Sequence, residues 1–318
     1  MTTYNGEKYL REQLDSIYNQ TRVPDEVIVC DDNSSDKTIS ILEEYSKSKG
    51  LKYYKNNPGL GVNKNFFKAI SLCSGDYISL CDQDDIWLPN KIETLFRKIS
   101  EIDNGQPCAV SSQCDNIDGV GNIINRNTAK DTSGYAATLL YKGVSQGCTM
   151  MINRCLAEMA LEFSSNVKYE GMIYDALIAY CAAIFGEKYN LGQSLMLYRH
   201  HNSNVMGNID AFSSPIKTKI NMPDTFVGFI HDVRIKDLSL IFNSCKSKIT
   251  NKSIYTLLST INEINSHNNL FVKLMKVFEI REYSLSQRLT IVVKTLGLKL
   301  LRIYYRFFSN KSSSLNIF

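Results

Sequence analysis

Three carboxylates crowd into four residues of the chain. Asp82, Asp84 and Asp85 follow directly on residues 77–80 (YISL), a run typical of a buried strand. Crowded acids repel one another and resist burial, so their place at a strand end needs a chemical reason. Two carboxylates two residues apart at a strand-to-turn junction can converge on one hard cation, and Mg²⁺ is typically held by one or two carboxylates plus substrate phosphates. The spacing is therefore compatible with a cation site completed by a diphosphate.

Two other interpretations of this acid cluster compete with a cation site. Asp85 precedes residues 86–89 (IWLP) and could simply cap a helix that follows. A calcium loop of the EF-hand type does not fit, because its glycine and its distal glutamate are missing. A single Asp-x-Asp pattern occurs in many proteins, so the surrounding elements must decide between a cation site and a cap.

The elements around the acids alternate between strand and helix. Helices are expected at 7–20, 37–47 and 62–72, and strands at 27–30, 51–54 and 76–81. This alternation indicates a parallel sheet covered by helices, and such sheets bind ligands outside the carboxyl ends of their strands. A second acid pair, Asp31 and Asp32, ends the strand 27–30. Both acid clusters are therefore expected at the binding edge.

The rest of the chain divides in two. Strands are expected at 108–111, 149–152 and 194–198, with a helix over 172–185, and a domain boundary is placed near residue 210. The 318-residue chain has a net charge of only +4, but residues 211–318 hold 16 Lys and Arg against 6 Asp and Glu. We expect domains at 1–210 and 211–318, the second helical, basic and in contact with an anionic surface.

Composition excludes several protein classes. The nine cysteines are an odd number without a Cys-x-x-Cys pair, which argues against a disulfide framework and a zinc ribbon and favours reduced thiols in the cytosol. No signal peptide is visible, and no uncharged apolar run reaches the ~18 residues of a membrane span.

Short motifs follow one another in order along residues 1–207. They read TTYNG at 2–6, VIVCDDNSSD at 27–36, GDYI at 75–78, DQDDIW at 82–87, GCTM at 147–150, YDA at 174–176 and YRHHNSN at 198–204. The ordered set resembles family 2 glycosyltransferases, and the DQDDIW wording is similar to rhamnosyltransferase-type enzymes of bacterial surface-polysaccharide synthesis. The resemblance implies a GT-A fold, an α/β architecture with a Rossmann-like, mixed, mostly parallel sheet flanked by helices. It also implies inverting, metal-dependent use of a nucleotide sugar.

The resemblance assigns the donor side of the site. Thr2, Tyr4 and Asp32 would hold the pyrimidine nucleoside, with Asp32 accepting a hydrogen bond from the base. Asp82 would lie near the ribose and the metal. Asp84 would bind Mn²⁺ or Mg²⁺ on the diphosphate, where the ion stabilises the charge of the leaving group.

Further roles come from the later motifs. His201 resembles a family histidine that reaches the metal or the diphosphate, although the neighbouring His200 is an alternative and a loop histidine without function is another. Gly147 and Trp87 would contact the acceptor. A large aromatic residue is also often part of the core, and both interpretations of Trp87 stand.

Inversion at the anomeric carbon needs a base for the acceptor hydroxyl. Asp175, at the start of an expected apolar helix, is the candidate. A carboxylate in a first helical turn also fits a capping role, because the helix dipole favours it there. Many relatives carry an acid or a histidine before this aspartate, whereas Tyr174 stands there in this chain.

The beginning of the chain departs from the family pattern. Family members have a full apolar strand before TTYNG, and Met1 stands where its last residue would be. A parallel sheet without that strand would leave main-chain groups unpaired. We hypothesise that translation starts upstream or that the chain is a truncated copy.

The end of the chain has the profile of an interfacial helix. Residues 285–308 place apolar side chains on one stripe, which is flanked by Arg288, Lys299, Arg302 and Arg306. This pattern favours a helix lying in a membrane interface, and the alternative is a helix packed on the catalytic domain. A polyprenyl-linked acceptor at the inner face of the cell membrane would give the contact a purpose.

The sequence thus predicts a cytoplasmic, peripheral membrane glycosyltransferase. It would move a sugar from a UDP- or dTDP-activated donor, such as dTDP-rhamnose, to a saccharide acceptor in capsule, O-antigen or cell-wall synthesis. No nucleic acid partner is expected. A metal-dependent nucleotidyltransferase is an alternative, but no Gly-rich, basic triphosphate loop lies near the N-terminus. A truncated, inactive copy is another. The sequence does not identify the sugar, the acceptor or the linkage.

Overall fold

The protein is described by a computed structural model that covers residues 1–134, 146–166, 172–201 and 236–266. The chain divides into two compact units, Met1–Ile209 and Asp210–Phe318. The first unit contains both acid clusters.

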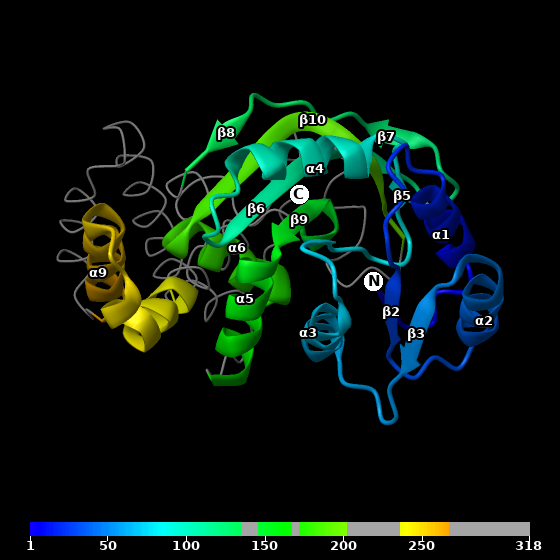
Figure 1. Ribbon diagram of the computed structural model, residues 1–318, viewed down its shortest axis with the longest axis horizontal. Helices are drawn as coiled ribbons and strands as arrows, with labels where there is room; N and C mark the ends of the chain where they lie inside the picture. The colour runs from blue at the N-terminus through cyan, green and yellow to red at the C-terminus, as the bar shows by residue number, and fades with distance from the viewer. Residues whose placement is uncertain (135–145, 167–171, 202–235, 267–318) are drawn as a thin grey trace, which may run out of the picture. The chain divides into compact units, whose positions relative to one another are not determined.

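A small parallel sheet holds the N-terminal motif. Its order is β1 (Thr2–Thr3), β2 (Ile28–Asp31) and β3 (Lys52–Lys55), and Figure 1 shows it in blue. The connecting helices are α1 (Leu10–Tyr18), α2 (Thr38–Lys49) and α3 (Val62–Leu72). The alternation of strand and helix predicted for this part is confirmed. The cause is local, because each helix buries one apolar stripe, such as Leu10 and Leu14 of α1, on the sheet.

A second, seven-stranded sheet carries the rest of the first unit. Its main order is β4 (Tyr77–Ser79), β9 (Met150–Asn153), β6 (Cys108–Ile117), β10 (Glu187–Arg199) and β5 (Ile86–Trp87). Two short strands pair at its margins, β7 (Ile123–Asn125) with β6 and β8 (Thr132–Ser133) with β10. Within this sheet only β6 and β10 run parallel. The expectation of a mostly parallel sheet holds for β1–β3 and not here, because the chain returns by antiparallel connections such as the β6–β7 hairpin.

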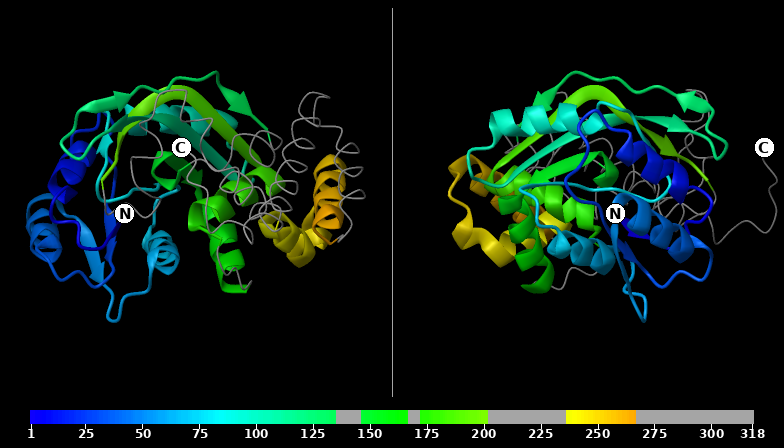
Figure 2. Two further views of the ribbon diagram at one scale, coloured as in Figure 1. Left: turned by 180° about the vertical axis from the view of Figure 1, so that it is seen from behind. Right: turned by 45° about the vertical axis from the view of Figure 1, so that its right-hand side comes forward.

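Helices cover both faces of the second sheet (Figures 1 and 2). One face packs on α4 (Lys91–Ile102), and the other on α5 (Arg154–Asn166) and α6 (Tyr174–Phe185). The α4 side contains fully buried Leu95, Ile99 and Val110. Each such side chain contributes about 2 kcal/mol by leaving water. The mixed α/β fold with helices on the sheet is therefore confirmed.

The described part of the second unit, residues 236–266, is helical. A helix over 236–245 runs into a 3₁₀ turn, Lys246–Lys248, and then α9 (Lys252–Ser266) follows. Phe242 and Tyr255 bring these two helices together, with ring centroids 5.2 Å apart. The predicted interfacial segment 285–308 lies outside the described residues. None of the helices in the described part of the chain is long and apolar enough to cross a membrane.

A glycine between α6 and β10 tests the packing of the second sheet. A Cβ on Gly186 would lie 1.8 Å from the Pro107 carbonyl oxygen, which accepts the hydrogen bond from Glu187 N at 2.9 Å. Gly186→Ala is therefore expected to destabilise the fold by about 2–4 kcal/mol in urea unfolding, because main chain must move. Gly75→Ala is the matched control, since its Cβ would meet nothing closer than 3.5 Å. Equal stability of the two variants would contradict this account.

Candidate active site

The two acid clusters lie where the strands β2 and β4 end. Asp31 is the last residue of β2, and residues 82–85 form the turn between β4 and β5, here called the acid turn. Their burial differs from the expectation of acids at an open edge. Asp31 is 0% exposed and Asp85 is 1% exposed. Part of each cluster is therefore built into the protein rather than presented to a ligand.

Asp31 connects the first two sequence motifs, residues 2–6 and 27–36. Its Oδ2 accepts hydrogen bonds from Thr3 Oγ1 at 2.9 Å and from Ser34 Oγ at 2.5 Å, and its Oδ1 accepts from Ser34 N at 2.9 Å. Three donors satisfy a buried carboxylate. Asp31 therefore fixes β1 to the loop after β2, a structural role.

Asp32, predicted to hold the base, anchors a loop. Its carboxylate accepts hydrogen bonds from Asn56 Nδ2 at 2.9 Å, Leu60 N at 2.6 Å and Gly61 N at 2.8 Å. Burial alone would raise the pKa of Asp32, but these hydrogen bonds bring the pKa below its usual range. An ionised carboxylate has about four acceptor positions, so room for about one further donor remains.

Gln83, which sequence reasoning passed over, links the acid turn to the N-terminal motif. Its Oε1 accepts from Tyr4 N at 2.9 Å and its Nε2 donates to Tyr4 O at 3.1 Å. A Cβ on Gly6 would lie 2.3 Å from Gln83 Oε1. Tyr4 itself is 59% exposed, and Thr2 is half-buried. Of the predicted donor residues, Tyr4 therefore lies beside the acid turn, with its ring open to solvent.

Asp84 faces a histidine from the end of β10. Its Oδ2 lies 2.8 Å from His201 Nε2, and the two side chains are 15% and 14% exposed. The neighbouring His200 points elsewhere: its Nε2 lies 3.1 Å from Asn116 Oδ1. Burial, with a contribution from His201, lowers the pKa of His200. Of the two histidines, His201 is the one that the fold brings to the acid turn.

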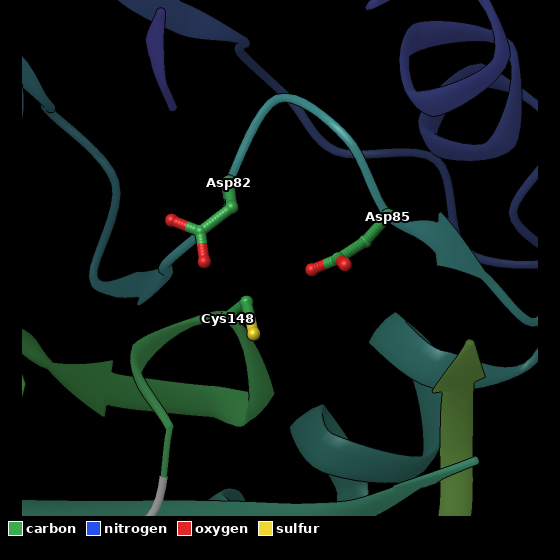
Figure 3. Close-up of side chains that lie close together, drawn as sticks. All are labelled: Asp82, Asp85 and Cys148. Atoms are coloured by element: carbon green, nitrogen blue, oxygen red, sulfur yellow. The ribbon is translucent and has the colours of Figure 1, made fainter. Parts of the chain in front are cut away.

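Asp82, Asp85 and Cys148 converge on one small volume (Figure 3). One ligand atom from each lies within 4.8 Å of the others. Asp85 Oδ1 accepts from Arg199 N at 3.0 Å, whereas Asp85 Oδ2 has no hydrogen-bond partner in the described part of the protein. Burial and the charges of the neighbouring aspartates raise the pKa of Asp85 well above its usual range. Burial, then Asp84 and Asp175, raise the pKa of Asp82 to about 7.

The capping interpretation of Asp85 is wrong. Strand β5 follows it directly, and α4 begins only at Lys91, after Asn90. Trp87 belongs to β5 and is 4% exposed within the core beside α4. Its ring has too little free surface to stack on a sugar. Of the two interpretations of Trp87, the structure supports core packing.

Lys91 is a buried lysine that none of the sequence motifs includes. It is 0% exposed, and its Nζ donates to Cys148 O at 2.5 Å and lies 3.9 Å from the centre of the Trp87 ring. Burial lowers the pKa of Lys91, and the charge of Asp85 opposes this. Lys91 in turn opposes the rise in the pKa of Asp85.

Asp175 lies in the first turn of α6, as predicted, and Gly147 holds it. Gly147 N donates to Asp175 Oδ2 at 3.1 Å. Burial raises the pKa of Asp175 to about 6, although this hydrogen bond opposes the shift. A Cβ on Gly147 would lie 2.2 Å from Tyr174 Oη, and the Tyr174 ring stacks on Phe66 with centroids 3.7 Å apart. Gly147 thus orients Asp175, and its predicted contact with the acceptor stays a prediction.

Comparison with known families identifies the framework of this site. The family model described as "Glycosyl transferase family 2" matches residues 1–155, which include both acid clusters and Gly147. By this match, residues 1–155, just under half of the chain, form a glycosyl transferase family 2 region. The predicted family and enzyme class, a glycosyltransferase, are thereby confirmed.

Individual proteins support this assignment. The chain is 28% identical over 232 residues to the dTDP-rhamnosyl transferase RfbG of Shigella flexneri, covering 68% of the chain and 77% of that protein. It is 31% identical over 171 residues to an uncharacterized glycosyltransferase of Rickettsia typhi, so it spans about half (52%) of that relative's length.

Solved structures show the same fold. The crystal structure of S. aureus TarS 1–349 in complex with UDP-GlcNAc matches with a TM-score of 0.55 and 18% identity, covering 87% of this chain and 77% of that one. This likeness supports the GT-A fold predicted from the motifs.

Two groups of side chains in this glycosyltransferase could hold a divalent cation. Adjacent ligands of an octahedral cation at about 2.1 Å lie about 3 Å apart, which the 2.8 Å between Asp84 Oδ2 and His201 Nε2 nearly matches. The group around Cys148 fits less well. Its thiol is 0% exposed with a pKa raised well above its usual range, and Mg²⁺ and Mn²⁺ prefer oxygen ligands. A donor diphosphate also reaches the partly exposed pair more readily.

Stability should report the cost of ionising Asp175. The pKa of about 6 exceeds the unfolded value, so the folded state binds the proton more tightly. The Asp175 carboxyl therefore makes its full contribution to the free energy of unfolding below about pH 4. That contribution is lost as pH rises through about 6. We expect Asp175→Asn to stabilise the protein by about 1–2 kcal/mol at pH 7.5 and to have no effect at pH 4, measured by urea unfolding. If Asp175→Asn is no more stable than wild type at pH 7.5, burial of the ionised Asp175 carboxylate does not destabilise the fold, and this account is wrong.

Proposed function

We propose that this chain is an inverting glycosyltransferase that moves a sugar from a UDP- or dTDP-linked donor to a saccharide acceptor. One observation carries the proposal: the Asp84–His201 pair and the separate carboxylate Asp175 lie around the same acid turn. The charge of Asp175 reaches Asp82 strongly enough to raise its pKa. Displacement at an anomeric carbon is assisted by a cation that stabilises the leaving group and by a base that accepts the acceptor proton. Asp84 and His201 would bind the cation, and Asp175 would be the base.

The donor would lie across the strand ends of the first sheet. Thr2 lies in β1, Tyr4 follows β1, and Asp32 follows β2, so they can line a nucleoside site. Asp82, between them and Asp175, would contact the ribose. Support for a nucleotide sugar comes from the relatives, one named as a dTDP-rhamnosyl transferase and one solved in complex with UDP-GlcNAc.

Asp84 and His201 would hold Mn²⁺ or Mg²⁺ on the donor diphosphate. When bound, the ion acts as a Lewis acid that stabilises the charge of the departing nucleoside diphosphate. Asp84 Oδ2 and His201 Nε2 lie 2.8 Å apart, so the two atoms can also share a proton. Protons and the cation therefore compete for the same pair of atoms.

Asp175 would act as the base. As the anomeric carbon forms its bond to the acceptor oxygen and loses its bond to the diphosphate, the acceptor hydroxyl proton passes to the Asp175 carboxylate. The Gly147 amide holds Oδ2 and sets the orientation of the carboxylate. A pKa of about 6 suits this task, because the group is ionised near neutral pH and still basic enough to accept a proton.

We further propose that residues 1–210 form the catalytic domain and that the basic region after them holds the protein at the inner face of the cell membrane, where a polyprenyl-linked acceptor lies. The support is the charge of residues 211–318, with 16 Lys and Arg against 6 Asp and Glu.

Single substitutions should separate binding from transfer. Asp84→Ala is expected to weaken Mn²⁺-dependent binding of the nucleotide sugar at least about tenfold, because a cation ligand is lost. Asp175→Asn should leave binding intact and lower the rate of transfer about 10²–10⁴-fold. Calorimetry and product formation would be measured with a panel of UDP- and dTDP-sugars.

Two matched variants serve as controls. Asp76→Asn removes an exposed carboxylate before β4, at the opposite end of that strand from the acid turn, and His200→Gln alters the histidine that does not face Asp84. Normal transfer by Asp175→Asn would refute the base. Unchanged Mn²⁺ dependence in Asp84→Ala would refute the cation ligand.

Membrane contact predicts flotation with lipid. The full chain should float with vesicles containing anionic lipid, and a variant with Lys299, Arg302 and Arg306 changed to Glu should float several-fold less. Vesicles of neutral lipid are the control. Equal recovery with both kinds of vesicle, or no flotation at all, would count against an electrostatic membrane contact.

A further inference from the structure

Arg199 is a charged side chain buried at the end of β10, two residues before His201. Only 2% of its side chain is exposed. A guanidinium keeps its charge at physiological pH, so its burial requires partners with matching geometry. The partners come from the acid turn and from α1.

The first set of contacts joins Arg199 to the acid turn. Arg199 N donates to Asp85 Oδ1 at 3.0 Å, and Arg199 Nε donates to Asp84 O at 2.9 Å. One bond uses the main chain of Arg199 and the other its side chain. The end of β10 and the acid turn, far apart in the sequence, are thus joined at two points.

The second set of contacts joins Arg199 to Glu12 of α1 and to Tyr9, the residue before α1. Arg199 Nη2 donates to Glu12 Oε2 at 2.5 Å, and the guanidinium lies 4.6 Å from the centre of the Tyr9 ring. The His201 ring lies against the same Tyr9 ring, with centroids 4.9 Å apart. Arg199 and His201 therefore share one aromatic support.

These contacts surround the pair proposed to hold the cation. The side chain of Asp84 faces His201 at 2.8 Å, while the main chain of Asp84 is held by Arg199. The Tyr9 ring, held on one side by Arg199, limits where the His201 ring can move. A guanidinium can make these contacts at once because its donors point in fixed, different directions.

We propose that Arg199 is a positioning residue for the cation site. It sets the separation of Asp84 Oδ2 and His201 Nε2 by holding the acid turn and the Tyr9 ring together. The inference rests on the proposed function, in which Asp84 and His201 bind the cation. A merely structural Arg199 would support the fold without affecting metal affinity, so the two roles make different predictions.

The test measures Mn²⁺ binding without turnover. Electron paramagnetic resonance would report free Mn²⁺ during titration of the protein in the presence of UDP or dTDP, and thermal unfolding would report stability. Arg199→Gln is expected to weaken Mn²⁺ binding about tenfold. Arg199→Lys should recover part of this loss, because an ammonium keeps the charge but cannot span both partners. Glu12→Gln, which alters only the partner on α1, should weaken binding about two- to threefold.

A double-mutant cycle identifies the route of the effect. If Arg199 acts through His201, Arg199→Gln should add little to the loss caused by His201→Ala, whereas independent effects would add. Additive losses, or lower thermal stability with unchanged Mn²⁺ affinity, would overturn the inference. If Arg199→Gln fails to fold, unchanged affinity in both Arg199→Lys and Glu12→Gln overturns it. Absence of Mn²⁺ binding by the wild-type protein would instead refute the proposed function, and this inference with it.

Discussion

Negative charge gathered at the strand ends is the constraint on which the rest of the structure depends. The protein meets it in three ways. Asp31 and Asp32 are satisfied by hydroxyl and amide donors. Asp85 has one donor, the Arg199 amide, and a raised pKa. Asp82 and Asp175 are left with pKa values of about 7 and 6. Perturbed carboxylates cluster where chemistry is done, and these two are the ones to which the proposed reaction gives tasks.

Two sheets have to meet for the site to exist. The first sheet carries Thr2, Tyr4 and Asp32 at or beside its strand ends, and the second sheet with its helix α6 carries the acid turn, His201 and Asp175. Apolar packing joins them, as where Ile17 of α1 shares a core cluster with Trp87, and two polar contacts join them beside the site: Gln83 pairs with the Tyr4 main chain, and Arg199 connects the acid turn with α1. Hydrogen bonds have narrow geometric tolerances, so these polar contacts fix positions more sharply than apolar packing would.

The sequence predicted what depends on neighbouring residues. The helix over 62–72 agrees with α3, because its apolar spacing is local. Of β10, Glu187–Arg199, only the last residues were foreseen, since its first half alternates weakly. The ordered sequence motifs also predicted which residue types would form the site. The burial of Trp87 and Lys91, and the choice between His200 and His201, were not, because they arise from contacts between distant segments that no periodicity records.

The reciprocal bonds between Gln83 and Tyr4 have an evolutionary consequence. Gln83 needs both a donor and an acceptor, and its side chain occupies the space that any Cβ at position 6 would fill. A larger residue at position 6 would therefore displace the Gln83 amide group and cost its two hydrogen bonds to Tyr4. Homologous chains should inherit these two positions as a pair, so that a change at one is accompanied by a change at the other.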